Sequence, residues 1–461
     1  MDDTKALTRT GDLTEGVIWK KLMGFFFPIM FGMLFQQLYN TADAIIVGKF
    51  VGTKALAAVG GSAAVIINLV IGFFTGLASG ATVIIAQCFG AKDDMRLSRT
   101  VHTIMTFCFI VGVIISVSSY FFIPWTLRLV NDPADIFDLS ARYLRIYFSG
   151  TVPLLIFNIG SGILRVVGDS KRPLYFLITC CLLNIVLDLL FVIVFHMGIA
   201  GAGWATVIAQ LISAILVLRC LVKDEGPQRL SFRKLTIDFS ALRLILYIGI
   251  SAGLQSIMYS VSNLIIQAAV NALGSTMVAA WTAAGKIDGI YWVTSNAFGI
   301  TICAFVGQCF GAGKYERMKK SVRQCLAIAL ATSAAFSVLI LSFSKYLCLI
   351  VSSDEEVISL ARQIMTYFVP YYVTWTVIEI LSNTLRGVGD AVRPVIIITL
   401  GVCLVRVLYI HYIVPIWGGI RCISYSYMIS WVITDVVLLI YYFRSDWLKR
   451  CMGKSSALQG E

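Results

Sequence analysis

The sequence predicts an all-α polytopic membrane protein of twelve transmembrane helices, in two six-helix bundles related by a pseudo-two-fold axis and forming a V-shaped cleft. Composition, the spacing of apolar runs and an internal repeat predict it. Of 461 residues, 58% are hydrophobic and 13% are charged, and the mean hydropathy is +0.85. A soluble domain has about 25% charged residues. At about 20 residues per span, no room remains for a sizeable soluble domain.

Apolar runs predict the twelve helices in order. They are 22–47, 57–87, 98–123, 136–164, 173–195, 200–222, 244–270, 276–308, 320–348, 355–385, 394–416 and 420–443. The expected organisation is a cytoplasmic segment (1–21), a first half (22–222), a cytoplasmic linker (223–243), a second half (244–443) and a cytoplasmic tail (444–461). The first 20 residues are polar and mixed in charge, so a cleaved signal peptide is not expected. Pro28, Pro153 and Pro370 inside apolar runs predict bends.

The two halves repeat one another. QCFGA occurs at 87–91 and again at 308–312, and LRVVGDSKRP at 164–173 corresponds to LRGVGDAVRP at 385–394. Both pairs lie 221 residues apart, as counted from 87 to 308 and from 164 to 385. A shared offset at two separate places indicates duplication. Six helices per half is an even number, so both halves enter the membrane in the same sense, around an axis along the membrane normal.

Charge predicts the orientation. The formal net charge is +12, and most Lys and Arg residues fall in the termini and the even-numbered connections. The positive-inside rule therefore places both termini in the cytoplasm of a multi-pass protein of the inner or plasma membrane, and the basic charge indicates anionic lipid rather than nucleic acid. The two LR-x-VGD-x-x-RP segments are predicted to be cytoplasmic turns, in which Gly168 and Gly389 permit the bend.

Polar groups inside predicted spans are the candidate functional residues, because an ionisable group at mid-bilayer costs at least about 2.5–3.5 kcal/mol. Three helices of the first half each present a polar stripe, with Gln36, Asn40 and Asp43, then Asn184 and Asp188, then Thr206 and Gln210. Tyr39 lies one turn before Asp43. Two carboxylates with amide and hydroxyl oxygens suit a proton or a small hard cation. The alternative is that both acids are hydrated near the outer interface.

The second half does not repeat the acids. The same offset from Asp43, Asn184 and Asp188 reaches Leu264, Val405 and Tyr409. The second half instead carries a possible charge network of Lys286, Asp288, Glu379 and Arg406. Two interpretations remain open: structural ion pairs (Glu379 with Arg406, and Lys286 and Asp288 each with a neighbour) or a coupling site, since unpaired charge in a bundle is expensive.

Further polar and aromatic groups are candidates for lining the cleft, where aromatic faces attract flat cations. They are Gln36, Asn40, Asn68, Asn158, Tyr259, Trp292 and Glu379. The GxxxG spacing of Gly72, Gly76 and Gly80 predicts close helix packing. GxxxxGK[ST], GxSxG, HExxH and C-x-x-C patterns do not occur in the sequence. We therefore expect neither an enzyme nor a cofactor, and no metal beyond Na⁺ at Asp43 and Asp188.

Several fragments match one family in order and spacing. They are LYNTADAIIVGKFVG (38–52), ALAAVG (55–60), GLASGATVIIAQCFGA (76–91), NIVLD (184–188), GIAGAGWAT (198–206), QCFGAGK (308–314) and the two LR-x-VGD-x-x-RP motifs. Along nearly its whole length the chain resembles the multidrug and toxic compound extrusion (MATE) transporters. The resemblance implies two six-helix lobes forming a V, a cavity between them, and export of cationic organic compounds driven by inward H⁺ or Na⁺.

Within that family the chain is most similar to the DNA-damage-inducible-type branch. The resemblance implies a first-half ion site at Asp43, Asn184, Asp188 and Thr206, with Tyr39 nearby. The sodium-coupled branch also uses acids on helices seven and ten. Helix seven of this chain has none, and Glu379 on helix ten does not match that pattern cleanly.

The functional prediction is a secondary active antiporter that exports small organic cations by alternating access of its two lobes and works as a monomer in the lipid bilayer. One alternative is a flippase for a lipid-linked precursor on the same fold. That function favours a cleft with several Arg or Lys residues to hold a diphosphate, whereas Lys286 and Arg406 are the only bases inside predicted spans. A second alternative is a non-transporting receptor or membrane enzyme, which would be expected to carry a sensor domain or catalytic motif.

Overall fold

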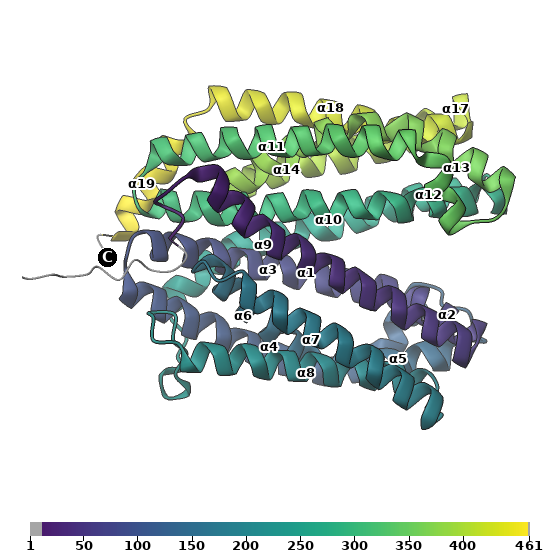
Figure 1. The fold of residues 1–461 in the computed structure, drawn as a ribbon, viewed down its shortest axis with the longest axis horizontal. Coiled ribbons are helices and arrows are strands. Elements are labelled where there is room, and N and C mark those ends of the chain that lie inside the picture. The colour runs from purple at the N-terminus through teal and green to yellow at the C-terminus, as the bar shows by residue number, and fades with distance from the viewer. Residues whose placement is uncertain (1–11, 460–461) are drawn as a thin grey trace, which may run out of the picture. The chain divides into compact units, whose positions relative to one another are not determined.

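The computed structural model describes residues 12–459, with side chains for 12–453. Residues 1–11 of the predicted N-terminal segment and residues 460–461 of the predicted tail lie outside the described residues. The described chain is helical and contains no β-strand, which confirms the predicted fold class. Figure 1 shows long helices running alongside one another within each half of the chain.

The elements of the first half begin with a helix that runs directly into a π-helical segment. They are α1 (Ile18–Ile46), η1 (Val47–Val51), α2 (Thr53–Gly60), α3 (Ser62–Gly90), α4 (Asp94–Leu129), α5 (Phe137–Ser149), α6 (Thr151–Val166), α7 (Lys171–Asp188), η2 (Leu189–Val194) and α8 (Ile199–Lys223). A short 3₁₀ turn, η3 (Phe232–Lys234), interrupts the linker that follows.

The second half has the same sequence of long helices. Its elements are α9 (Phe239–Asn271), α10 (Ser275–Gly311), α11 (Tyr315–Ser342), α12 (Ser344–Val351), α13 (Glu355–Phe368), η4 (Val369–Tyr371), α14 (Tyr372–Gly387), α15 (Val392–Ile398), η5 (Thr399–Leu404), α16 (Val405–Tyr412), α17 (Val414–Trp417), α18 (Gly419–Arg444) and α19 (Trp447–Gln459).

Helix ends recur at the offset of the sequence repeat. α3 ends at Gly90 and α10 at Gly311, α4 begins at Asp94 and α11 at Tyr315, and α6 ends at Val166 and α14 at Gly387. Each pair is separated by the same 221 residues as the QCFGA motifs. The duplication read from two short motifs therefore extends to the helical framework.

The spans agree with the predicted number. Eleven helical segments are long and apolar enough to cross a membrane, and twelve if the bent pair α5 and α6 counts as one span. That pair bends by 49° around Gly150, close to the bend predicted at Pro153. In the tenth span Pro370 lies in η4, where the helix tightens between α13 and α14. The membrane environment explains this architecture, because only helices satisfy their own backbone groups in lipid.

The chain divides into two compact bodies. The first, called the N-lobe, comprises Phe27–Ile250, and the second, called the C-lobe, comprises Ser251–Glu461 together with Gly16–Phe26. Two helices are therefore shared between the lobes. α1 passes from the C-lobe to the N-lobe one residue before Pro28, and α9 passes back between Ile250 and Ser251.

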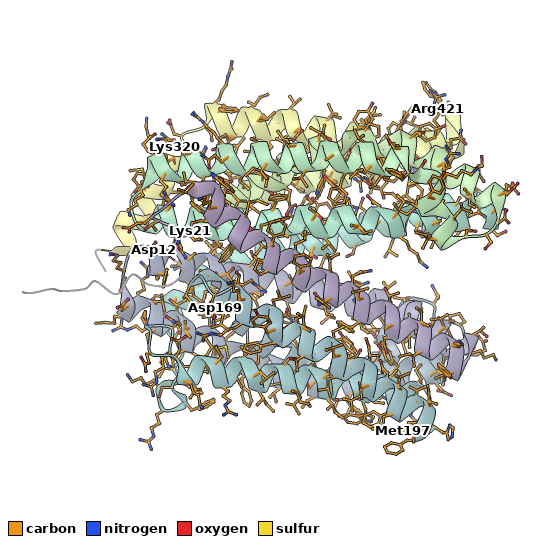
Figure 2. All side chains as sticks on the ribbon, viewed as in Figure 1. Asp12, Lys21, Asp169, Met197, Lys320 and Arg421 are labelled. Atoms are coloured by element: carbon orange, nitrogen blue, oxygen red, sulfur yellow. The ribbon has the colours of Figure 1, made fainter. Side chains whose placement is uncertain are left out.

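Both lobes keep polar and charged turns at their ends and apolar side chains on their outer faces. Figure 2 shows Asp169 and Met197 at opposite ends of the N-lobe, and Lys320 and Arg421 at opposite ends of the C-lobe. Between such ends the outer face of α4 is apolar, with exposed Phe109, Ile110, Val113, Ile114, Val117 and Phe121. An apolar stripe of that length faces lipid rather than water.

The two repeated motifs form the predicted turns. Gly168 and Gly389 have φ angles of 96° and 94°, in the left-handed region where glycine is unstrained. The Asp169 carboxylate accepts the Arg172 backbone N–H at 3.1 Å and pairs with its guanidinium at 2.8 Å. At the equivalent turn, Asp390 accepts a hydrogen bond from the Tyr441 hydroxyl. The motif therefore orders a tight connection between two spans.

The linker between the lobes is attached to α4. The Ser231 N–H donates to His102 Nε2 at 3.0 Å, so Nδ1 carries the hydrogen and donates to the Ser98 carbonyl at 2.7 Å. The Asp238 N–H donates to the Thr103 hydroxyl at 3.0 Å. Hydrogen bonds from the Ser240 hydroxyl and the Ala241 N–H hold the pKa of Asp238 below its ordinary value, so this cap of α9 is charged near neutral pH.

Replacing His102 with Phe should loosen the linker, because the Ser231 N–H loses its acceptor while the ring volume is kept. An unpaired buried donor costs about 1–3 kcal/mol, and local opening should increase by about tenfold. Limited trypsin digestion checks this through cleavage after Arg229, Arg233 and Lys234. A His196→Phe variant is the control, since His196 is exposed. Equal cleavage of the two variants would show that the contact does not hold the linker.

Candidate functional site

A buried polar site lies inside the N-lobe at the ends of three helices. Asp43 lies in the last turn of α1, Asn184 and Asp188 lie in the last two turns of α7, and Thr206 lies in the second turn of α8. Their exposed fractions are 7%, 1%, 0% and 3%. The spacing of four residues places Asn184 above Asp188 on one face of α7, and packing of α7 against α8 brings Thr206 to that face.

The four side chains lie together. The Asn184 amide donates to the Thr206 hydroxyl at 3.5 Å, and that hydroxyl donates to the Ala202 carbonyl at 3.1 Å. The Asp43 and Asp188 carboxyl groups face each other closely enough for one of them, once protonated, to donate a hydrogen bond to the other. Two ionised carboxylates in that position have no hydrogen between them and repel each other.

The oxygens of this site have no hydrogen-bond donor. Asp43 Oδ1, Asn184 Oδ1 and both carboxylate oxygens of Asp188 are buried without a partner in the described structure. An unpaired buried acceptor costs about 1–3 kcal/mol, and more when it is charged. Four such atoms in one place require a positive species, and carboxylate, amide and hydroxyl oxygens suit a proton or a hard cation such as Na⁺. The alternative that both acids are hydrated at an interface does not agree with their burial.

Tyrosines surround the acids on two sides. Tyr39 lies one turn before Asp43 and is close to it, as the spacing in α1 predicts. Tyr143 and Tyr147, with ring centres 6.1 Å apart on α5, also approach Asp43. Gln210 on α8 lies beside the Tyr147 hydroxyl. The sequence interpretation missed the two α5 tyrosines, although their spacing of four residues was a usable signal.

Both acid-bearing helices continue as π-helix immediately after the site. η1 begins four residues after Asp43, and η2 begins at Leu189, directly after Asp188. The two π-helical segments pack against each other. A π-helical turn has a wider, less regular hydrogen-bond ladder and often lies at functional sites. The site therefore lies where the backbone of α1 and α7 is least constrained.

The other polar candidates of the first half lie outside this cluster. Gln36, Asn40 and Asn68 have exposed side chains. Asn158 is partly buried, donates to the Leu154 carbonyl at 2.9 Å, and lines a small pocket with Thr75 and Cys108. Only Asp43 of the three polar positions predicted as a stripe on α1 is buried with the acids of α7.

The C-lobe holds a separate group of polar and aromatic side chains. The Asp288 carboxylate on α10 accepts hydrogen bonds from the Tyr372 hydroxyl and, at 2.5 Å, from the Trp292 indole. Trp292 packs edge-on against Trp375, with ring centres 4.7 Å apart, and Tyr259 lies 5.8 Å from Trp375 on another side. The predicted cleft residues Tyr259 and Trp292 are thus part of one aromatic cluster.

The four charges predicted in the second half do not form one network. Within the described residues Glu379 and Arg406 make no ion pair: Glu379 accepts from the Asn383 amide at 2.8 Å, and the Arg406 guanidinium stacks on Tyr427. Lys286 is exposed and makes no ion pair there with Asp288, whose oxygens are occupied by Tyr372 and Trp292. Neutral partners replaced the expected ion pairs because they lie closer on the neighbouring helices.

A duplicated bundle of apolar helices that encloses an ion-type site within one lobe defines a membrane transporter rather than an enzyme. The chain belongs to the MatE family, whose model matches residues 28–190 and 239–411. This confirms the resemblance stated from the sequence. Assignment to the DNA-damage-inducible-type branch within the family stays a prediction.

Relatives match the chain over nearly its whole length. The probable multidrug resistance protein YoeA of Bacillus subtilis is 28% identical over 94% of this chain and 95% of its own length. The probable multidrug resistance protein YpnP of the same organism is 27% identical over 95% of this chain and 97% of its own. The chain is thus a multi-pass membrane protein of a transporter family.

Solved structures share the fold. A transporter of the MOP superfamily from Pyrococcus furiosus superimposes with a TM-score of 0.88 at 23% identity, covering 96% of this chain and 98% of that one. A MATE structure in a bent conformation has a TM-score of 0.87 at 23% identity, with the same coverage of each chain. At that identity the likeness supports the fold of this chain.

Proposed function

We propose that this protein is a secondary active multidrug efflux antiporter that exchanges inward-moving H⁺ or Na⁺ for outward-moving organic cations. The observation that carries the proposal is the set of buried oxygens without donors on Asp43, Asn184 and Asp188. A site that is incomplete without a positive species, in a chain related to proteins named for multidrug resistance, supports ion coupling.

The ion acts by neutralising buried charge. When the lobes are open outward, H⁺ or Na⁺ binds between Asp43 and Asp188 and removes their repulsion. α1, α7 and α8 then repack, and the π-helical segments η1 and η2 accommodate the change. This repacking weakens cargo binding and favours the inward-open state. Cargo shifts the equilibrium back only through its different affinity for the two states.

The proposal places the protein in the inner or plasma membrane with both termini in the cytoplasm, working as a monomer. The predominance of Lys and Arg in the termini and the even-numbered connections supports this orientation. The flippase alternative requires several bases at the cargo site, whereas Lys286 is exposed and the Arg406 guanidinium lies on a tyrosine ring.

Everted membrane vesicles containing the protein test the function. A fluorescent organic cation should accumulate inside when a proton gradient or a sodium gradient is imposed in the direction opposite to cargo movement, and the effective gradient identifies the coupling ion. Vesicles without the protein are the control. If neither gradient drives accumulation while a lipid-linked diphosphate is translocated, the antiporter function is wrong and the flippase replaces it.

A further inference from the structure

Three buried hydrogen-bond donors of the C-lobe have no acceptor in the described structure. They are the Arg406 guanidinium Nε on α16, the Trp375 indole N–H on α14 and the Trp431 indole N–H on α18. Their residues are 3%, 6% and 1% exposed. Native interiors pair nearly all buried polar groups. Three unpaired donors in one lobe therefore need an explanation.

The three donors belong to one contiguous cluster. The Trp375 and Trp431 rings are 5.7 Å apart, and Trp431 is 5.6 Å from Tyr427. The Arg406 guanidinium lies 4.0 Å from the centre of the Tyr427 ring, and one of its nitrogens donates to the Ser430 hydroxyl at 3.4 Å. The unmet hydrogen-bonding capacity is thus concentrated around α16 and α18.

The guanidinium in this cluster has no ion-pair partner among the described residues. The nearest candidate acids of the lobe are held elsewhere, Asp288 by Tyr372 and Trp292, and Glu379 by Asn383. A buried cation without a counter-charge is strongly unfavourable. Its planar fork of N–H groups matches a carboxylate in two parallel hydrogen bonds. The missing partner is therefore an anionic oxygen group.

The cluster also presents flat aromatic surface with an accessible side. Tyr259, Trp292 and Tyr427 are partly exposed, whereas Trp375 and Trp431 behind them are buried. Trp292 packs against both buried tryptophans, with ring centres 4.7 Å and 6.2 Å apart. Aromatic faces around a few directed polar groups are typical of small-molecule sites.

We propose that Arg406, Trp375 and Trp431 form a subsite for the carboxylate of a flat aromatic cargo. The cargo of this transporter then includes zwitterionic aromatic acids besides simple cations. This inference rests on the proposed efflux function and specifies its substrate class. The carboxylate pairs with the guanidinium and accepts from an indole, while the aromatic body packs on Trp292 and Tyr259. Because the donors are enclosed in this structure, Tyr427 must move to admit the acid.

A matched pair of rhodamine dyes tests the inference, one with a free carboxylate and the other its methyl ester. Binding to the protein in nanodiscs is measured by quenching of tryptophan fluorescence, and export is measured in everted vesicles. The wild-type protein should bind the acid at least as tightly as the ester. Arg406→Gln should lower the ratio of acid to ester affinity by about tenfold or more, the size expected for a charged hydrogen bond. Arg406→Lys should keep part of the preference.

Arg421→Gln is the matched control, because Arg421 is an exposed guanidinium that lies near the Tyr425 ring on the same helix as Tyr427. Its acid-to-ester ratio should equal that of the wild type. A wild-type protein that binds the ester but rejects the acid overturns the subsite while leaving the efflux function intact, and so does an Arg406→Gln protein with an unchanged ratio. If the wild-type protein neither binds nor exports either dye, the efflux function itself fails.

Discussion

Replacing Asp188 with Asn should abolish ion-driven efflux. Asn has nearly the same shape but takes up no proton and brings no negative charge to a cation, and Asp188 has both oxygens buried without a donor. Losing the partner of a buried charge costs about 3–5 kcal/mol, which corresponds to about 100-fold or more in ion affinity. The measurement is accumulation of a fluorescent cation in everted vesicles under the effective gradient. Asp43→Asn should have the same effect.

The same variant should gain stability as it loses function. In the absence of an ion, wild-type Asp188 is a buried carboxylate facing Asp43, so the neutral amide removes a repulsion. The thermal midpoint of the purified wild-type protein should rise when its coupling ion is added, because that ion binds the folded state. For Asp188→Asn the midpoint should begin higher and respond less to the ion.

Asp135→Asn is the control for both measurements, because Asp135 is an exposed residue paired with Lys54 at 3.5 Å. It should transport and unfold like the wild type. Efflux at the wild-type rate by both Asp43→Asn and Asp188→Asn would remove these acids from the coupling mechanism. The duplicated helical framework does not depend on that result.

The fold could be predicted from sequence because lipid imposes one solution on apolar segments. Backbone groups in hydrocarbon must pair within their own helix, so each long apolar run predicts a span. The exception is the run 136–164, which forms α5 and α6 with a 49° bend. Gly150 and Pro153 indicated that a bend was permitted, but its angle depends on packing against α4 and α8, which a single sequence does not contain.

The N-lobe site was largely predictable because its residues follow helical spacing. Asn184 and Asp188 are four residues apart on α7, and an acid in an apolar run is costly enough to indicate a function. Tyr143 and Tyr147 were missed because tyrosines in an apolar run are usually interfacial or packing residues. Their role depends on α5 lying beside α1 and α7, which is tertiary information.

The second half shows where reasoning from charge alone reaches its limit. Pairing Glu379 with Arg406 was reasonable because each charge needs a partner. The fold instead places Tyr427 against the guanidinium and the Asn383 amide against the carboxylate. Opposite charges in one lobe pair only when their helices present them at the same height, and a one-dimensional sequence does not specify that height.

Replacing Gly80 with Ala should strongly destabilise the N-lobe. Gly80 on α3 lies against the backbone of α9, where a Cβ atom would come within 2.6 Å of the Gly249 nitrogen and 2.9 Å of its Cα. Backbone atoms cannot move aside as a flexible side chain can, so the two helices must separate. Overpacking of this kind costs about 1–3 kcal/mol or more. The measurement is the free energy of unfolding of the detergent-purified protein, with its thermal midpoint as a second readout.

The reverse contact makes the prediction specific. A Cβ atom on Gly249 would lie 2.8 Å from the Leu77 Cα, so Gly249→Ala should carry a similar penalty. Because both methyl groups open the same crossing, the double variant should cost less than the sum of the single variants. Gly285→Ala is the control, since a Cβ there meets nothing within 4 Å. Removing a helical glycine at an open position should be neutral or stabilise by about 0.5–1 kcal/mol. Equal stability of the Gly80 and Gly285 variants would show that α3 and α9 do not cross at this point.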